Sequence, residues 1–484
     1  MADTTLPVDH ATVRGFVDGA WLEDDGAELL PVLNPSTGEV LAHVAVTSEQ
    51  DVDRAVLAAV NALPAWAAST PRVRSEALLA LADLCVNHFD ELAMLEALDA
   101  GKPIAAVRDG ELPGVIDGIR FFAGAARAMS APAPAEYIGG TTSIMLREPV
   151  GVVAAITPWN YPLWQALWKI CPAVATGNTM VIKPAELTPM STTRLVELAS
   201  HVLPHGVLNI VHGPGRTTGE HLTRHPRVDL VSFTGSVAAG KHVAHAAADG
   251  LKRVVMELGG NAPAIVFADA DLAAAAEAIT TGALYNAGQE CTAPARVLVH
   301  VDVAAELGRL LADATRTWTI GDTLDETTLL GPLASEAHRL RVESLLTATA
   351  TAGGTVVGGA RPDRPGFYLE PAIVTTPDAA SAVVVEELFG PVVTIQTFTD
   401  DDEALLMGND TAFGLAASVW TRDVGRALRM ARKLQFGTVW INAHIPLVNE
   451  MPHGGYKQSG YGKDMSIYSL EEYTQIKHVM ASLD

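Results

Sequence analysis

Cys291 lies in the stretch Gly-Gln-Glu-Cys-Thr at 288–292, directly after a helical pattern that ends near Asn286. A cysteine attacks as its thiolate, and addition to a carbonyl carbon creates an oxyanion that needs hydrogen-bond donors. Taken alone, a single cysteine is more typical of a small buried apolar side chain. The adjacent glycine and the Gln-Glu pair favour a loop, so Cys291 is a candidate nucleophile.

Two other residues have the chemistry that such a nucleophile needs. Glu257 ends an apolar run and precedes Leu-Gly-Gly-Asn at 258–261, where two glycines leave room for substrate or cofactor. A carboxylate there can act as a general base if burial raises its pKa, although an isolated strand-end glutamate is more typical of a solvated surface. Asn160, in Thr-Pro-Trp-Asn-Tyr-Pro at 157–162, has an amide that can donate to an oxyanion. A turn explains the same residues equally well.

Two glycine-containing segments are candidates for phosphate binding. The segment 213–219, which includes Gly215, resembles a dinucleotide fingerprint, but its last glycine falls one position late. A plain turn is the alternative there. Gly235 and Ser236 follow an apolar run and open a helical pattern, so backbone N–H groups and the helix dipole can face a pyrophosphate. A simple Gly-Ser helix cap is the alternative at this second segment.

Lys183 and Glu186 follow the apolar run 179–182. A carboxylate after a strand can accept the hydroxyls of an adenosine ribose while it repels a 2′-phosphate. Exposed Lys and Glu are common after strands, so this motif gains weight only in combination with others.

The elements that must position these residues follow a regular alternation from Val150 onward. Short apolar runs separated by helical segments predict parallel βαβ units and a doubly wound sheet, with the ligand at the carboxyl ends of the strands. A second α/β pattern runs from Ala264 to about Met451. The expected strands are 152–156, 179–182, 207–211, 230–233 and 254–256, with helices at 191–202 and 236–248.

The flanking regions have other patterns. Residues 47–100 and 112–129 have helical spacing, with Ser48 and Ser75 as candidate helix caps. The segments 141–147 and 473–481 have strand-like compositions, and their composition suggests that they pair in a small separate sheet.

Length, charge and cysteine content limit the class of protein. A chain of 484 residues with 49% hydrophobic residues predicts two or three domains. The net charge of −23 argues against nucleic-acid or anionic-membrane partners and suits cationic small molecules. The three cysteines lie far apart without a C-x-x-C spacing, which argues against a disulfide framework or a zinc cage. Residues 1–16 have no signal-like apolar run, and polar residues and prolines interrupt 150–174, so we expect a cytoplasmic protein without a membrane span.

Six motifs in this order resemble those of the aldehyde dehydrogenase superfamily, and the resemblance covers essentially the whole chain. Glu257 and Cys291 are separated by 291 − 257 = 34 residues, which is also similar to that family. The motifs are Pro-Trp-Asn at 158–160, Lys-Pro-Ala-Glu at 183–186, Phe-Thr-Gly-Ser at 233–236, Glu-Leu-Gly-Gly-Asn at 257–261, Gly-Gln-Glu-Cys at 288–291 and Glu-Leu-Phe-Gly-Pro at 387–391.

The resemblance implies an NAD-dependent enzyme that needs no metal. Cys291 would be the nucleophile, Glu257 would activate the deacylating water, and Asn160 with the backbone N–H of Cys291 would bind the oxyanion. The implied cofactor residues are Trp159, Lys183, Glu186, Gly215, Gly235, Ser236, Glu387 and Phe389. The implied regions are an NAD-binding domain (1–127 plus 149–258), a catalytic domain (259–458) and a small β oligomerisation region (128–148 plus 459–484) of a dimer or tetramer.

Within the superfamily the chain is most similar to the aminoaldehyde group, the γ-aminobutyraldehyde (1-pyrroline) dehydrogenases. Tyr161 and Trp168 would line an aromatic funnel for an alkylammonium, and Glu111 and Glu290 would pair with the amine. Glu290 departs from the aspartate usual in that group, which puts the depth of the pocket in doubt. The alternatives are a betaine-aldehyde or broad aliphatic or aromatic aldehyde dehydrogenase, and a non-catalytic relative that keeps the fold.

Overall fold

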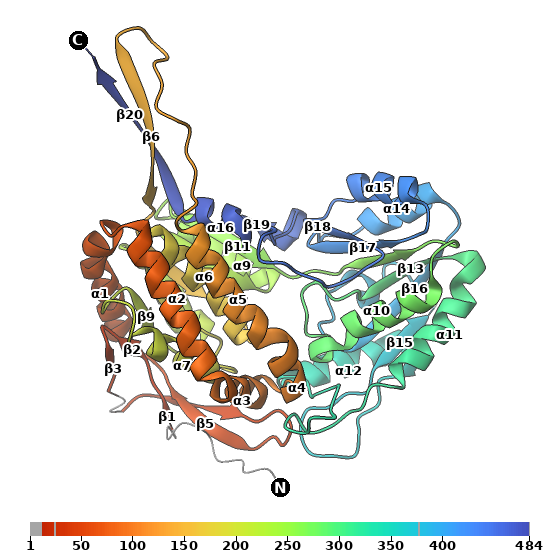
Figure 1. Ribbon diagram of the computed structural model, residues 1–484. Coiled ribbons are helices and arrows are strands. Elements are labelled where there is room, and N and C mark those ends of the chain that lie inside the picture. Colours follow the sequence, from red (N-terminus) through yellow and green to blue (C-terminus); the bar gives the residue numbers. More distant parts are fainter. Residues whose placement is uncertain (1–11, 24–25, 376–377, 484) are drawn as a thin grey trace.

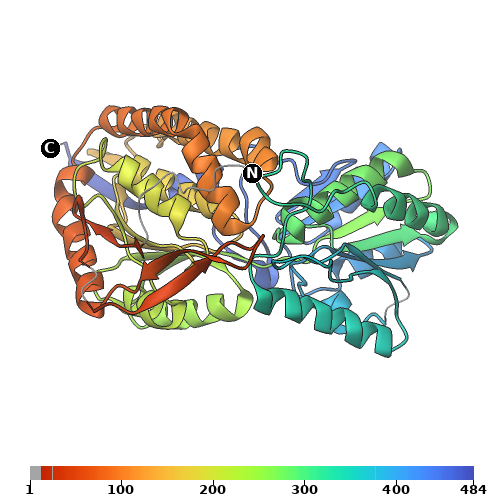
Figure 2. The same cartoon turned by 90° about the horizontal axis from the view of Figure 1, so that it is seen from below.

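The computed structural model describes residues 12–23, 26–375 and 378–483. Two α/β lobes lie side by side, and a two-stranded arm projects from the first of them (Figure 1). Seen from below, the N-terminal strands cross the first lobe toward the second (Figure 2). Most of segment 1–16, on which the expectation of a cytoplasmic location partly rests, lies outside the described residues.

The first lobe contains an eight-stranded sheet whose central five strands are parallel, in the order β11-β10-β7-β8-β9. This order makes the sheet doubly wound, with the reversal of strand order between β7 and β10, and confirms the expected fold class. The central strands are β7 (Val152–Ile156), β8 (Thr179–Lys183), β9 (Leu208–Ile210), β10 (Leu230–Gly235) and β11 (Arg253–Leu258). The edge strands are β19 (Gly460–Tyr461) and β3 (Ala20–Trp21), and β2 (Phe16–Val17) lies between β9 and β3. A separate three-stranded sheet contains β1 (Thr12–Val13), β4 (Leu29–Leu33) and β5 (Val40–Ala45).

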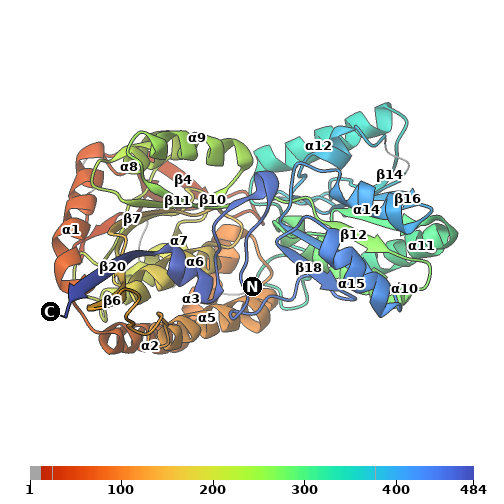
Figure 3. The ribbon, with the colours of Figure 1, turned by 90° about the horizontal axis from the view of Figure 1, so that it is seen from above.

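Helices bury their apolar faces against both sides of this sheet, as Figure 3 shows from above. One side carries α2 (Pro71–Asn87), α3 (Phe89–Ala100), α5 (Leu112–Ala125), α6 (Pro162–Thr176) and α7 (Met190–Ala199). The other side carries α1 (Glu49–Ala67), α8 (Glu220–Arg224) and α9 (Val237–Ala248). Between α3 and α5 lie the short α4 (Ile104–Ala106) and a π-helical turn, Val107–Glu111.

The second lobe contains a seven-stranded sheet in which β14 is the antiparallel edge strand and the other six strands are parallel. Its strands are β14 (Thr355–Gly358), β15 (Ala372–Thr375), β16 (Val392–Phe398), β13 (Arg296–His300), β12 (Pro263–Val266), β17 (Ala416–Trp420) and β18 (Thr438–Ile441). Its helices are α10 (Leu272–Leu284), α11 (Ala304–Thr315), α12 (Glu336–Thr351), α13 (Ala382–Val385), α14 (Asp401–Asn409) and α15 (Val424–Lys433).

The arm consists of β6 (Thr141–Pro149) and β20 (Thr474–Ser482), which pair antiparallel along their whole length (Figure 1). This confirms the pairing expected from composition. Strand β19 pairs with β11 in the first sheet, so the expected oligomerisation segment 459–484 includes residues that belong to the first lobe. The short helix α16 (Ser466–Glu472) connects β19 to the arm.

The helix caps test the local predictions. Ser48 caps α1 by accepting from the backbone N–H of Asp51, as expected. The prediction for Ser75 is wrong, because it lies inside α2 and Thr70 accepts the capping bond from Val73. Pro71 at the first helical position explains the earlier start, since its ring already has the helical φ and its missing N–H needs no partner there. None of the helices in the described part of the chain is long and apolar enough to cross a membrane.

Candidate active site

The reversal of strand order in the first sheet places three loops around one pocket of about 320 Å³. The loop after β7 contributes Trp159 and Asn160, the loop after β10 contributes Ser236, and Glu257 stands at the end of β11. The second lobe closes the pocket with Cys291, His338, Arg341, Glu387 and Phe389. This is the place where a doubly wound sheet binds ligands.

A left-handed turn presents Cys291 to this pocket. Helix α10 ends at Leu284, and Asn286, Ala287 and Gly288 have φ values of 49°, 55° and 72°. A Cβ at Gly288 would lie 2.1 Å from the carbonyl oxygen of Gly390, so only glycine fits there. The packed turn holds the cysteine backbone at the boundary between the two lobes.

Asn160 is buried beside Cys291, and its side-chain amide donates to the carbonyl oxygen of Gln289 at 3.0 Å. The backbone carbonyl oxygen of Asn160 accepts from the side-chain amide of Asn286 at 2.9 Å. An amide nitrogen has two N–H groups, so one remains for a ligand in the pocket that Asn160 lines.

Glu257 is buried at the end of β11, and its Oε1 has no hydrogen-bond partner among the described residues. The expectation that the following glycines leave room for a ligand stays a prediction, and Gly259 does line the pocket. A Cβ at Gly259 would lie 2.1 Å from Oε2 of Glu387, and one at Gly260 would lie 2.1 Å from the carbonyl oxygen of Cys291. The two glycines make room for the protein's own chain, which brings Glu387 and Cys291 close to β11.

The thiol of Cys291 is surrounded by negative charge. Burial and the carboxylates of Glu257, Glu290 and Glu387 raise the pKa of Cys291 well above that of a free cysteine. The thiol lies 3.4 Å from Oε1 of Glu290, to which it donates. A positive charge bound on either side of the sulfur would therefore favour the reactive thiolate.

The wall of the pocket opposite Cys291 is aromatic. The rings of Trp159 and Phe389 meet edge to face at 5.3 Å, and Nε2 of His338 lies 2.7 Å from the carbonyl oxygen of Phe389. Glu387 accepts from the backbone N–H of Gly260 at 2.8 Å, and burial raises its pKa to about 8.

Lys183 connects its own segment, 183–186, with the glycine-containing segment 213–219. Its buried ammonium donates to the carbonyl oxygens of Pro184 and Gly213 at 3.0 and 2.9 Å, and it lies 3.5 Å from Glu186. Burial lowers its pKa. The segment Gly215–Gly219 forms a π-helical turn whose last glycine packs against the Lys183 side chain, while Gly215 itself is exposed.

The first pocket has the N-terminus of a helix in its wall. Gly235 and Ser236 line the pocket at the start of α9, and Ser236 caps that helix by accepting from Ala239 at 3.3 Å, which confirms the cap interpretation, while pyrophosphate binding there stays a prediction. The hydroxyl of Thr234 is buried in the same wall without a hydrogen-bond partner among the described residues. Free donors and a helix N-terminus suit an anionic group.

A second pocket, of about 190 Å³, lies on the other side of Cys291. The four residues expected for the substrate all line it, namely Glu111, Tyr161, Trp168 and Glu290. Residues without an assigned role in the sequence also line it, namely Trp164, Gln165, Tyr285, Ile445, Pro446, Leu447 and His453. All of these except Tyr285 lie far from Cys291 along the chain, which hides them, although the glycines after His453 resemble those around the other site residues.

The acidic end of this second pocket already contains a lysine. The ammonium of Lys102 lies 2.5 Å from Glu111, 3.3 Å from Glu96 and 3.8 Å from the centre of the Tyr161 ring. Lys102 therefore already pairs with the carboxylate of Glu111 and covers one face of the Tyr161 ring. Glu290 accepts from the backbone and hydroxyl of Thr292 at 3.1 and 3.0 Å.

Comparison with known proteins agrees with this geometry. The model of the aldehyde dehydrogenase family matches residues 21–479, and the chain belongs to that family. It is 40% identical to the aminoacetaldehyde dehydrogenase of Pseudomonas aeruginosa, over 96% of this chain and 95% of the relative, and 38% identical to the betaine aldehyde dehydrogenase of Bacillus subtilis, over 96% of both. The crystal structure of betaine aldehyde dehydrogenase from Staphylococcus aureus in complex with NAD+ superposes with a TM-score of 0.95 at 39% identity, covering 97% of this chain and 95% of that one.

Proposed function

We propose that this protein is an NAD-dependent aldehyde dehydrogenase that oxidises aminoaldehydes, 4-aminobutanal (1-pyrroline) foremost, to carboxylates. The observation that carries the proposal is the position of Cys291 in the wall of both pockets. One pocket suits a dinucleotide and the other is aromatic with acidic groups. The sulfur can then attack an aldehyde in the second pocket while the hydrogen on the aldehyde carbon faces the cofactor in the first.

The proposed chemistry follows from the residues around the sulfur. The thiolate of Cys291 adds to the aldehyde carbon, and the oxyanion accepts from the Asn160 amide and the Cys291 backbone N–H. NAD, when bound, supplies the hydride acceptor that turns the thiohemiacetal into a thioester. Glu257 then removes a proton from the water that attacks the thioester, which releases the carboxylate and restores the thiol.

We assign the cofactor to Trp159, Glu387 and Phe389 at the nicotinamide end, and to Gly235 and Ser236 at the pyrophosphate. Lys183 and Glu186 would hold the adenosine ribose, with Gly215 at the edge of the same region. The half-exposed carboxylate of Glu186 is free to accept ribose hydroxyls and would repel a 2′-phosphate.

Replacement of Glu186 by glutamine is expected to raise the catalytic efficiency with NADP relative to NAD by about tenfold, roughly 1.4 kcal/mol. The amide keeps the shape of the side chain but removes the charge that repels the extra phosphate. Steady-state rates with each cofactor measure the ratio. Glu277→Gln, at an exposed carboxylate on α10, is the matched control. An unchanged ratio in Glu186→Gln would remove Glu186 from the ribose site.

The substrate is proposed from the second pocket. Trp164 and Trp168 lie with ring centres 6.3 Å apart, and Glu290 lines the same pocket 3.4 Å from the thiol. Aromatic faces and a carboxylate attract an alkylammonium, and the relatives named above act by their names on aldehydes that carry a cationic nitrogen. The second candidate is betaine aldehyde, favoured by those names and by the same aromatic walls.

The test is NADH formation at saturating NAD with 4-aminobutanal, betaine aldehyde, hexanal and benzaldehyde. We expect the catalytic efficiency with the aminoaldehyde to exceed that with hexanal by more than about tenfold, roughly 1.4 kcal/mol. A tenfold preference for hexanal would reject recognition of a cation, while a preference for betaine aldehyde would make that compound the substrate.

The preference for a cation is expected to increase with pH. Burial raises the pKa of Glu111 to about 7, so its carboxyl is neutral below that pH and charged above it. The carboxylate faces Lys102, Glu96, Glu290 and Tyr285, and its ionisation makes the pocket more negative. Between about pH 6 and 8 the catalytic efficiency with betaine aldehyde relative to hexanal should rise about three- to tenfold, or roughly 0.7 to 1.4 kcal/mol.

Betaine aldehyde is chosen for this measurement because its charge does not titrate, and the ionisation of Cys291 cancels in the ratio. Glu111→Gln should give a ratio that is flat with pH. A ratio that falls as the pH rises would contradict the role of Glu111.

We also propose that the arm mediates assembly into a dimer or tetramer. An isolated two-stranded ribbon is only marginally stable, and this one exposes the apolar side chains of Leu146, Ile476 and Met480. The double variant Ile476→Glu/Met480→Glu should lower the molar mass measured by light scattering while leaving the circular dichroism spectrum unchanged. A monomeric unmodified protein would refute the assembly.

A further inference from the structure

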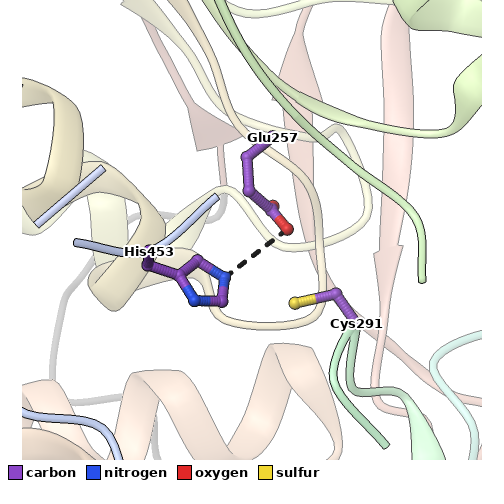
Figure 4. A group of neighbouring side chains, drawn as sticks. All are labelled: Glu257, Cys291 and His453. Carbon is purple, nitrogen blue, oxygen red and sulfur yellow. Dashed lines mark ion pairs between the residues drawn. The ribbon is translucent and has the colours of Figure 1, made fainter. Parts of the chain in front are cut away.

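His453 forms a cluster with Cys291 and Glu257 at the boundary of the two pockets. The sulfur, a ring nitrogen and a carboxylate oxygen lie within 4.8 Å of one another, and the three side chains point toward a common centre (Figure 4). His453 is 1% exposed, and neither of its ring nitrogens has a hydrogen-bond partner among the described residues. Oε1 of Glu257 has none either. Two buried polar groups thus face a sulfur without being satisfied.

Contacts with neighbouring residues hold His453 in place. Its backbone exchanges hydrogen bonds with Asp464 in both directions at 2.9 Å, and Lys169 holds the buried Asp464 carboxylate at 3.2 Å. The ring lies 5.2 Å from that of Trp168. The imidazole therefore stays beside the sulfur.

Sulfur, imidazole nitrogen and carboxylate oxygen are the three ligand types that zinc takes in proteins. In a tetrahedral site with zinc–ligand distances of about 2.0 to 2.3 Å, neighbouring ligand atoms lie about 3.3 to 3.6 Å apart. Nε2 of His453 and Oε1 of Glu257 are 3.7 Å apart, close to that distance. The sulfur of Cys291 lies within 4.8 Å of both atoms, so its side chain would have to move toward them when the metal binds, and three protein ligands leave a fourth position open.

The charge of the cluster also favours a divalent cation. A thiolate and one carboxylate balance the two positive charges of zinc, and Glu290, 3.4 Å from the sulfur, adds further negative potential. The thiol proton passes to solvent when the metal binds. Mg²⁺ prefers oxygen ligands in an octahedral arrangement and does not suit this set.

We propose that Cys291, Glu257 and His453 form a zinc-binding site that reversibly inhibits the enzyme. The bound metal occupies the sulfur and the carboxylate together, so neither addition to an aldehyde nor water activation can proceed. The metal takes no part in catalysis. The inhibition rests on the proposed roles of Cys291 and Glu257, whereas zinc binding does not.

Equilibrium dialysis of the cofactor-free protein against Zn²⁺ alone tests the site. The unmodified protein should bind one zinc per chain, and Cys291→Ala and His453→Phe should each weaken that binding by at least about tenfold. Cys171→Ala, at a buried cysteine that lines neither pocket, and His221→Ala, at one of a half-buried pair of histidines in the first lobe, are the matched controls and should bind normally. Equal binding by Cys291→Ala, loss of binding in His221→Ala, or equally tight binding of Mg²⁺ would overturn the proposal.

The rate at which iodoacetamide alkylates Cys291 is a second test, and mass spectrometry of the peptide that contains Cys291 measures it directly. Zn²⁺ should slow the alkylation in the unmodified protein but not in His453→Phe, even if that variant has lost activity. Unprotected alkylation in the unmodified protein would overturn the proposal. The two proposals can fail separately. If zinc binds with the expected pattern but the Cys291→Ala variant still oxidises aldehydes, the metal site is supported and the proposed function is refuted.

Discussion

Replacement of Cys291 by alanine is expected to lower kcat by about 10⁴-fold or more with every aldehyde. Among the described residues Cys291 is the only one that lines both pockets, and without its thiol neither a thiohemiacetal nor a thioester can form. NAD binding should be nearly unchanged, because the cofactor contacts proposed above come from other residues. Steady-state NADH formation and isothermal titration with NAD measure the two effects separately.

Cys171→Ala is the control for the loss of a cysteine. Cys85 and Cys171 are fully buried in the first lobe, where burial raises the pKa of the Cys85 thiol to about 12 and that of Cys171 further still. Neither of these cysteines lines either of the two pockets, so Cys171→Ala should turn over normally. Persistent turnover of Cys291→Ala would refute the proposed mechanism.

Replacement of Glu257 by glutamine is expected to stop the reaction after its first half. The amide is similar in shape to the carboxylate but cannot take a proton from water, so the thioester accumulates on Cys291. Rapid mixing should show a burst of about one NADH per chain, followed by a steady-state rate reduced about 10²- to 10⁴-fold. Mass spectrometry of the stalled protein should find the acyl group on Cys291.

Glu257→Asp provides the matched comparison, because it restores the carboxylate one methylene short and should recover part of the deacylation rate. A slow first turnover without a burst would mean that Glu257 acts on the thiol of Cys291 and not on the water. Normal steady-state turnover of Glu257→Gln would assign water activation to another group.

Much of the fold was predictable because its signals are local. Strands β7, β8, β10 and β11 coincide with apolar runs bounded by turns, and the alternation with helices already implies parallel crossovers. The pairing of β6 with β20 followed from composition alone, as both segments have strand-like compositions far from the main pattern. Strand β19 was not predicted, because two residues carry too little pattern to reveal a partner about 200 positions away.

The chemistry of the site divides in the same way. Cys291, Glu257 and Asn160 were identifiable from residue type and short motifs, since a thiol, a carboxylate and an amide each suggest a role. Their meeting at one sulfur depends on the order of strands in the sheet and on the left-handed turn before Cys291, which are properties of the folded chain.

The tertiary structure alone decided how the charges are shared. Glu111 was expected to pair with the amine of the substrate, yet the ammonium of Lys102 lies 2.5 Å from its carboxylate. The two residues are nine positions apart, and the π-helical turn Val107–Glu111 lies between them. Gly259 and Gly260 were expected to make space for a ligand, and the structure shows that they also accommodate Glu387 and Cys291. His453 reaches Cys291 from 453 − 291 = 162 positions away. Contacts of this kind depend on packing between distant segments, which the local preferences of a sequence do not encode.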